Sequence, residues 1–274
     1  MFLPVLYEYT LFNFLFMKLI PQTVLILCLI LTSSNIISAQ VKTIHVYVAL
    51  CDNMYQGIVP VNEEIGNGQS PRNNLYWGAA YGVKSFFRYI DDDWQLVKTL
   101  ESSNPHILDR ILFKHINEDI YMLAEAYDGK YIKECITDFL SAVNNHNEVE
   151  VQHMSQGLKF GGGADLIAYI GHDGLMDFNL NLAFTLNKMK PKDVIVLACF
   201  SKEFFAPHLQ EARANPILWT TNLMAPEAYT LEAAIDGWIL NESGKEIEER
   251  AAQAYNRYQK CGIIGARSLF TSGF

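Results

Sequence analysis

Two residues that could carry out covalent chemistry each follow an apolar segment of the chain. His172 comes after the run 165–170 (DLIAYI) and Gly171, and Cys199 comes directly after the run 193–198 (DVIVLA). A thiol is a strong nucleophile once it is deprotonated, and a nearby imidazole can take its proton or stabilise the thiolate. The pair therefore predicts a cysteine–histidine catalytic dyad, provided that the fold brings the two side chains together.

The two apolar runs indicate how the fold could do so. Strands that are apolar on both faces are typical of a parallel sheet covered by helices. Ligands of such sheets bind at the carboxyl ends of the strands. If the two runs form neighbouring strands, joined by a crossover through residues 178–190 and a turn at Pro191 and Lys192, both side chains emerge at the same edge.

The rest of the chain alternates between strand and helix patterns. We expect strands at 43–50, 119–126 and 216–220, and helices at 75–89, 131–143, 203–214, 226–240 and 245–259. A long connection rich in Gly, Asn and Pro, 51–74, is of the kind that is usually functional or mobile. The alternation predicts one α/β domain over 40–274, with a doubly wound, mostly parallel sheet covered by helices on both faces.

Residues 1–39 have the pattern of a secretory signal peptide. They carry only two charged side chains, contain the short apolar run 23–31 (TVLILCLIL) and end in a small-residue cleavage pattern at Ala39. Met17 is a natural start for this signal. The alternative is a retained membrane anchor, although Lys18 and Pro21 interrupt the apolar stretch. We therefore predict a secreted or periplasmic protein that meets a membrane only if the segment is retained.

Charge and cysteine content exclude several classes of function. The net charge is −9 and no basic stripe is visible, which argues against nucleic-acid binding. The predicted mature part has four cysteines: Cys51, Cys135, Cys199 and Cys261. Their wide spacing, with no CxxC pair and no Cys/His cluster, predicts neither a disulfide scaffold nor a zinc site, and leaves any pairing open. No metal or cofactor is expected, and the glycines at 161–163 lack the Lys-Ser/Thr of a phosphate loop.

Two segments carry a resemblance to a known family. Residues 166–174 (LIAYIGHDG) and 194–199 (VIVLAC) resemble the caspase, legumain and gingipain group of cysteine peptidases, in which one apolar block ends in His-Gly and a later one in Ala-Cys. The resemblance is specific over 165–201 only. It implies a caspase-like fold, a His172/Cys199 dyad and a peptide or protein substrate that is cleaved after a residue chosen by a dedicated pocket.

One position departs from the pattern of that group. Asp173 stands between His172 and Gly174, where the group has glycine directly after the histidine. The group's oxyanion donors would carry over as the backbone N–H groups of Asp173 and Cys199. A carboxylate at 173 would make the imidazole more basic and would disfavour the thiolate.

The alternative to a peptidase is thus a caspase-like domain that no longer cleaves and serves as a binding or scaffold module. A third class, another Cys/His hydrolase, lacks its Gly-x-Cys-x-Gly elbow.

The sequence indicates the residues of a specificity pocket less clearly than it indicates the His172/Cys199 pair. In the resembling group, residues after the first strand often help to bind the substrate side chain, and here Asp52 could select Lys or Arg by charge pairing. The alternative is that Asp52 forms a turn with Asn53. Tyr76, Trp77 and Tyr81 could line a substrate groove, or could pack in the core as such spacing on a helix more often indicates.

Overall fold

The computed structural model describes residues 41–182 and 191–274, and Val41–Phe274 form one compact unit. The predicted signal peptide at 1–39 and the second half of the predicted crossover at 178–190 lie outside the described residues. No helix among the described residues is long and apolar enough to cross a membrane.

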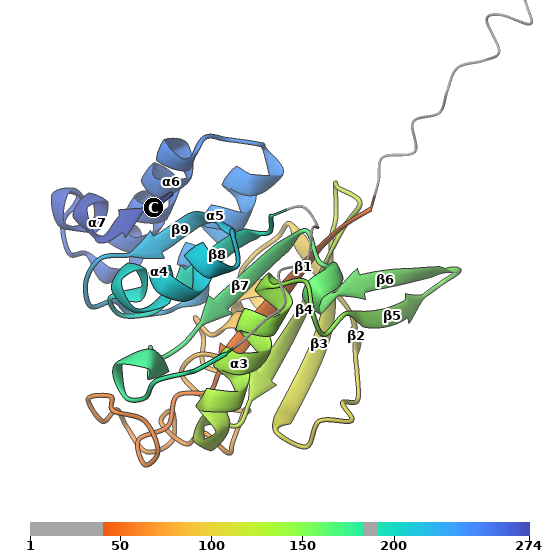
Figure 1. The fold of residues 1–274 in the computed structure, drawn as a ribbon, viewed down its shortest axis with the longest axis horizontal. Coiled ribbons are helices and arrows are strands. Elements are labelled where there is room, and N and C mark those ends of the chain that lie inside the picture. The colour runs from red at the N-terminus through yellow and green to blue at the C-terminus, as the bar shows by residue number, and fades with distance from the viewer. Residues whose placement is uncertain (1–40, 183–190) are drawn as a thin grey trace, which may run out of the picture. The chain divides into compact units, whose positions relative to one another are not determined.

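An eight-stranded sheet, in the order β10-β9-β8-β7-β1-β4-β3-β2, forms the centre of the described chain (Figure 1). Its strands are β1 (Lys42–Ala49), β2 (Trp94–Thr99), β3 (Ile107–His115), β4 (Ile120–Tyr127), β7 (Leu166–Ile170), β8 (Asp193–Leu197), β9 (Asn215–Thr220) and β10 (Phe270–Thr271). The strands from β9 to β4 run parallel, whereas β10, β3 and β2 pair antiparallel at the two edges. The expectation of a mostly parallel α/β sheet is confirmed.

Helices cover the two faces of this sheet. They are α2 (Val83–Tyr89), α3 (Ile132–Val143), α4 (Ser201–Glu211), α5 (Ala228–Ile239), α6 (Gly244–Gln259) and α7 (Ile263–Leu269), with 3₁₀ turns η1 (Gly129–Tyr131), η2 (Gly161–Gly163) and η3 (Gly174–Met176). Alternate residues of β1 separate the two cores. Tyr47 and Ala49 pack with α3 and α4, whereas Val46 and Val48 pack with α2, α5 and α6. In Figure 1, α3 lies across the face of the sheet that is turned to the viewer.

A two-stranded hairpin, β5 (Val149–His153) and β6 (Gln156–Phe160), is not paired with the main sheet and projects from it in Figure 1. Its apolar side chains pack on residues of β3 and β4, among them Leu112 and Leu123. Neither this hairpin nor the β2–β3 pair was expected from the sequence. Both contain strands in which polar and apolar residues are mixed, as in WQLVKT of β2 and VEVQH of β5, so no long apolar run marks them.

The predicted helix at 75–89 is wrong in its first half. Only Val83–Tyr89 is helical, and residues 75–82 form a series of turns. Asn74 is the physical reason. Its side chain accepts a hydrogen bond from the Cys51 N–H (3.0 Å) and donates one to the Cys51 carbonyl (2.8 Å), which fixes the chain to the end of β1. Its own carbonyl accepts from the N–H groups of Trp77 and Ala79, closing turns in place of a regular helix.

Candidate active site

His172 and Cys199 line the same cavity, at the carboxyl ends of two neighbouring strands. β7 and β8 pair in parallel, with Ile170 level with Leu197. His172 and Cys199 each stand two residues beyond these partners, so the equal register carries both to one edge of the sheet. The cavity that they line has a volume of about 360 Å³. The structure therefore places both predicted residues in the wall of one cavity. Among the described residues, the hydrogen bonds of the Cys199 thiol go to Met224, and none joins it to the His172 ring.

The backbone before His172 is held in a conformation that favours glycine. Gly171 has φ +152°, and a Cβ atom there would lie 2.9 Å from the Ala49 carbonyl oxygen. This close approach to the end of β1 turns the chain out of β7. The Tyr169 hydroxyl then donates to the His172 carbonyl at 2.6 Å, so the residue that presents the imidazole is fixed on both sides.

The imidazole of His172 has a carboxylate partner that the sequence analysis did not identify. Nε2 lies 2.7 Å from Oδ2 of Asp177, which also accepts a hydrogen bond from the Gly57 N–H at 3.0 Å. With Nε2–H donating to Asp177, the free ring nitrogen Nδ1 is the proton acceptor of the neutral imidazole. Nδ1 makes no hydrogen bond to another described residue. This arrangement is that of a base oriented by a third group.

Cys199 lies in the tight turn between β8 and α4. Phe200, the next residue, is left-handed with φ +50° and caps the helix. The hydroxyl of Ser201 donates to the Val196 carbonyl at 2.9 Å and accepts from the Thr220 N–H at 2.9 Å, tying the turn to β9. These bonds fix the turn that carries Cys199 to β8 and β9.

The thiol itself rests against the backbone of Met224. Its Sγ accepts from the Met224 N–H at 3.5 Å and donates to the Met224 carbonyl at 3.7 Å. Burial raises the pKa of Cys199, the Met224 N–H lowers it, and the carboxylate of Asp173 raises it further. The resting form is therefore the thiol, and the sulfur needs a base to become a nucleophile.

Asp173 is fully buried beside this pair. Its Oδ1 accepts from the Leu175 N–H at 3.0 Å, and its Oδ2 has no partner among the described residues. Burial raises the pKa of Asp173 to about 7, against the hydrogen bond from Leu175 and with help from the charge of Asp177. As expected from the sequence, the Asp173 carboxylate raises the pKa of Cys199 and so disfavours the thiolate. In mildly acidic solution, however, the Asp173 carboxyl is neutral.

The two expected oxyanion donors have free hydrogens. Neither the Asp173 N–H nor the Cys199 N–H donates a hydrogen bond to another residue in the described part of the chain. Both groups belong to the turns that follow β7 and β8, at the same edge of the sheet as the cavity. Their use in binding an oxyanion stays a prediction.

Asp52 is not among the described residues that line this cavity. The Asp52 carboxylate accepts from the N–H groups of Met54 (2.8 Å) and Tyr55 (3.1 Å) through Oδ1, and from the Gln69 amide (2.6 Å) through Oδ2. These bonds close a turn, so the alternative given for Asp52, that of a turn residue, describes its place in the structure.

The three aromatic residues of segment 75–82 divide between the two alternatives. Tyr76 lines the cavity of His172 and Cys199. Trp77 is a core residue whose Nε1 donates to Asp109 at 2.9 Å. Tyr81 packs edge-on against the rings of Tyr229 and Tyr258 on α5 and α6.

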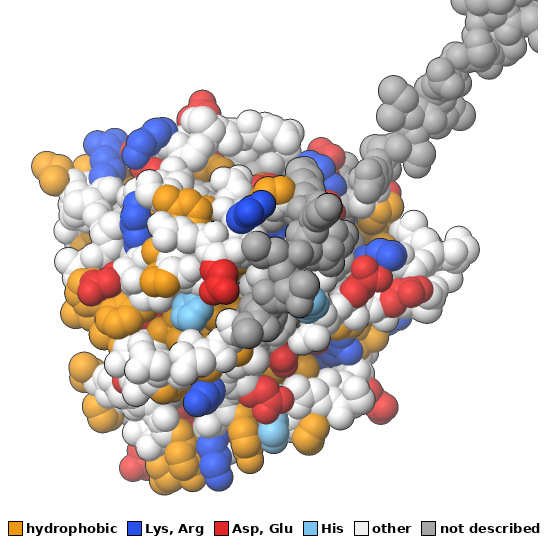
Figure 2. All heavy atoms as spheres, in the orientation of Figure 1, with side chains coloured by type: hydrophobic (Ala, Val, Ile, Leu, Met, Phe, Trp, Pro, Cys, Tyr) orange, Lys and Arg blue, Asp and Glu red, His pale blue; other side chains and the backbone are white. Residues whose placement is uncertain are grey.

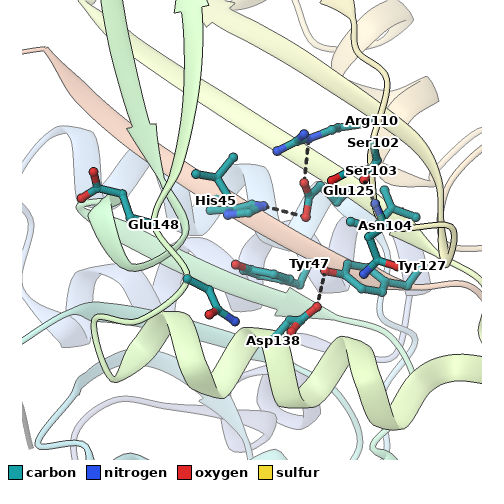
Figure 3. A pocket seen from close by; sticks show the side chains of 13 residues that line it. His45, Tyr47, Ser102, Ser103, Asn104, Arg110, Glu125, Tyr127, Asp138 and Glu148 are labelled. Atoms are coloured by element: carbon teal, nitrogen blue, oxygen red, sulfur yellow. Dashed lines mark hydrogen bonds and ion pairs between the residues drawn. The ribbon is translucent and has the colours of Figure 1, made fainter.

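A second cavity, of about 330 Å³, is polar and lies between the sheet and α3 (Figure 3). Glu125 at its centre pairs with His45 Nε2 (3.1 Å) and with Arg110 Nε (2.7 Å). Nδ1 of His45 accepts from the Gly161 N–H at 2.9 Å, so both ring nitrogens are engaged. Because His45 is fully buried and both of its ring nitrogens lie close to these partners, we interpret the network as a structural link between β1, β3, β4 and η2.

The described residues contain no cluster of three or more His, Cys, Asp or Glu side chains that could hold a metal ion. Cys51, Cys135, Cys199 and Cys261 are all free thiols. On the face shown in Figure 2, basic side chains are dispersed among acidic ones rather than gathered in a stripe.

No family model, no curated protein and no solved structure matches this chain. Any function must therefore be inferred from the sequence and geometry of this chain itself.

Proposed function

We propose that this protein is an exported cysteine peptidase of caspase-like fold, in which Cys199 is the nucleophile and His172 the general base. One observation carries the proposal: a thiol and an imidazole with a free Nδ1 line one cavity, while a carboxylate holds the other ring nitrogen. The segment 1–39 supports the exported location, and the resemblance over 165–201 supports the reaction class.

In the proposed reaction, Nδ1 of His172 takes the proton from the Cys199 Sγ, and the sulfur attacks the carbonyl carbon of a peptide bond. The N–H groups of Asp173 and Cys199 receive the oxyanion. The imidazolium, stabilised by Asp177, gives its proton to the leaving amine as the C–N bond breaks. Water then attacks the acyl-enzyme, with His172 again as base, releasing the acid and restoring the thiol.

A second candidate is a binding or scaffold module that no longer cleaves. The specific observation in its favour is the raised pKa of Cys199, to which burial contributes most and the carboxylate of Asp173 also contributes. In that case the sulfur would stay a thiol, and His172 would have no measurable effect on its reactivity.

The rate of alkylation separates the two candidates. We expect a peptidyl acyloxymethyl ketone to label Cys199, with labelling abolished in Cys199→Ala and slowed about 100-fold in His172→Ala, in line with the usual contribution of a general base. Cys261→Ala is the matched control, because Cys261 is an exposed thiol far along the chain from the dyad. Equal labelling of Cys199 and Cys261, unaffected by His172→Ala, would favour the scaffold module.

A further inference from the structure

We infer that the cavity beside Cys199 accepts a large apolar side chain, so that the proposed peptidase cleaves next to residues such as Leu, Met or Phe. This inference rests on the proposed function and adds the substrate class. It differs from the charge pairing with Lys or Arg considered for Asp52, whose carboxylate is occupied by its own turn.

The lining of the cavity is the first reason. Apart from glycine and the dyad itself, the described residues that line it carry apolar or aromatic side chains: Ile58, Val59, Val61, Leu75, Tyr76, Met176, Leu223, Met224, Ala225 and Pro226. No Asp, Glu, Lys or Arg is among them. The carboxylate of Asp177 contacts two lining residues but is already engaged by the His172 Nε2 and the Gly57 N–H. A charged substrate side chain would therefore lose its hydration in the cavity without gaining a charged partner from the described lining, which is unfavourable.

The rim of the cavity is the second reason. Val59 is 87% exposed and Leu223 is 65% exposed, and Met176 is also open to solvent. Large apolar side chains that stay exposed around a concave apolar site mark a surface that a ligand covers. They come from three separate segments, the 51–74 connection, η3 and the segment after β9, so more than one part of the chain contributes exposed apolar surface to this cavity.

Size and position agree with a side chain as the occupant. The volume of about 360 Å³ lies at the lower end of small-molecule sites, roughly 300–1,000 Å³. Cys199 and His172 are part of the wall, so a side chain that enters the cavity brings its own backbone carbonyl to the sulfur. Met224, whose backbone contacts Sγ, also lines this cavity.

The test is a series of peptidyl acyloxymethyl ketones and fluorogenic peptides that differ only in the residue before the scissile bond. We expect kcat/KM and the rate of Cys199 labelling to be at least 10-fold higher for Leu, Met or Phe than for Ala, and at least 100-fold higher than for Arg, Lys or Asp, since burial of such side chains gives selectivity of this order.

Two substitutions locate the selectivity. Leu223→Asp at the rim and Val61→Asp in the wall should lower the rate with Leu probes at least 10-fold and raise that with Lys probes. Leu240→Asp, at a similarly exposed leucine that does not line the cavity, should leave both rates unchanged. Since Leu223 is largely exposed, its variant is expected to fold even if the Val61 variant does not.

The outcomes separate this inference from the function on which it rests. Cleavage that depends on Cys199 and His172 but prefers Arg, Lys or Asp would overturn the apolar pocket and leave the peptidase standing. Equal rates with all probes would do the same. Failure of every peptide and every probe to react at Cys199 would overturn the proposed function and this inference together.

Discussion

Asp173 makes the stability of this protein depend on pH in a way that one substitution should remove. Its carboxyl is fully buried, one of its oxygens has no partner among the described residues, and burial raises its pKa to about 7 from the ordinary 3.8. Because the pKa is raised in the folded state, the fold is most stable below about pH 4, where the carboxyl is protonated in both the folded and the unfolded chain. That stability is lost as the pH rises from about 4 to about 7, because only the unfolded chain ionises freely.

The size of the effect follows from the two pKa values. At about 1.4 kcal/mol for each pH unit, the difference between 3.8 and about 7 corresponds to a total loss of about 4 kcal/mol. Between pH 5 and pH 8, the accessible part of this loss is about 2–3 kcal/mol. Asp173→Asn removes this titration. Relative to the wild type, the free energy of unfolding of the variant should therefore be about 2–3 kcal/mol more favourable at pH 8 than at pH 5.

Urea denaturation of both proteins at pH 5 and pH 8 measures this change. Comparing differences across pH removes the constant cost of placing an amide in the site, which affects both pH values equally. Asp92→Asn is the matched control, because Asp92 is an exposed carboxyl and its loss should leave the pH dependence unchanged. If wild type and Asp173→Asn lose the same stability between the two pH values, the carboxyl is not kept neutral by its surroundings and the reasoning fails.

Two further predictions concern the other carboxyl groups of the fold. Asp177→Asn should lower kcat about 10- to 100-fold with little change in KM, because His172 keeps its place but loses the carboxylate that fixes its tautomer. Steady-state kinetics and the acid limb of the pH profile test this prediction. A change in KM alone would contradict it. Glu125→Gln should lower the free energy of unfolding by about 3 kcal/mol, because it leaves the largely buried charge of Arg110 without its partner. Denaturation at pH 7 tests this prediction, and a loss below about 1 kcal/mol would refute it.

The placement of His172 and Cys199 could be predicted because long apolar runs carry a strong signal. Strands buried on both faces need apolar residues at every position, so 165–170 and 193–198 reveal both the strands and the polar residues that end them. The β2–β3 pair lies at one end of the sheet, where β2 is the edge strand and much of its surface is only partly buried. Its mixed composition therefore gave no comparable signal.

Asp177 and the cavity wall could not be predicted for a different reason. The bond between Asp177 and His172 depends on how η3 turns the chain, and the approach of Gly57 to the same oxygen joins segments 120 residues apart. Likewise, the apolar pocket forms from the 51–74 connection and the segment after β9, neither of which has a regular pattern. Such contacts are tertiary, and no local periodicity encodes them.

The two acids that follow His172 act on the dyad in opposite ways because they differ in burial. Asp177 is partly exposed, and its Oδ2 contacts both the His172 Nε2 and the Gly57 N–H. Asp173 has no such partners for one oxygen, and burial raises its pKa to about 7. As Asp173 loses its charge below that pH, its opposition to the thiolate of Cys199 weakens. We therefore expect Asp173→Asn to raise the rate of Cys199 alkylation more at pH 8 than at pH 6. An equal effect at both values would show that the side chain acts on the dyad by its shape and not by its charge.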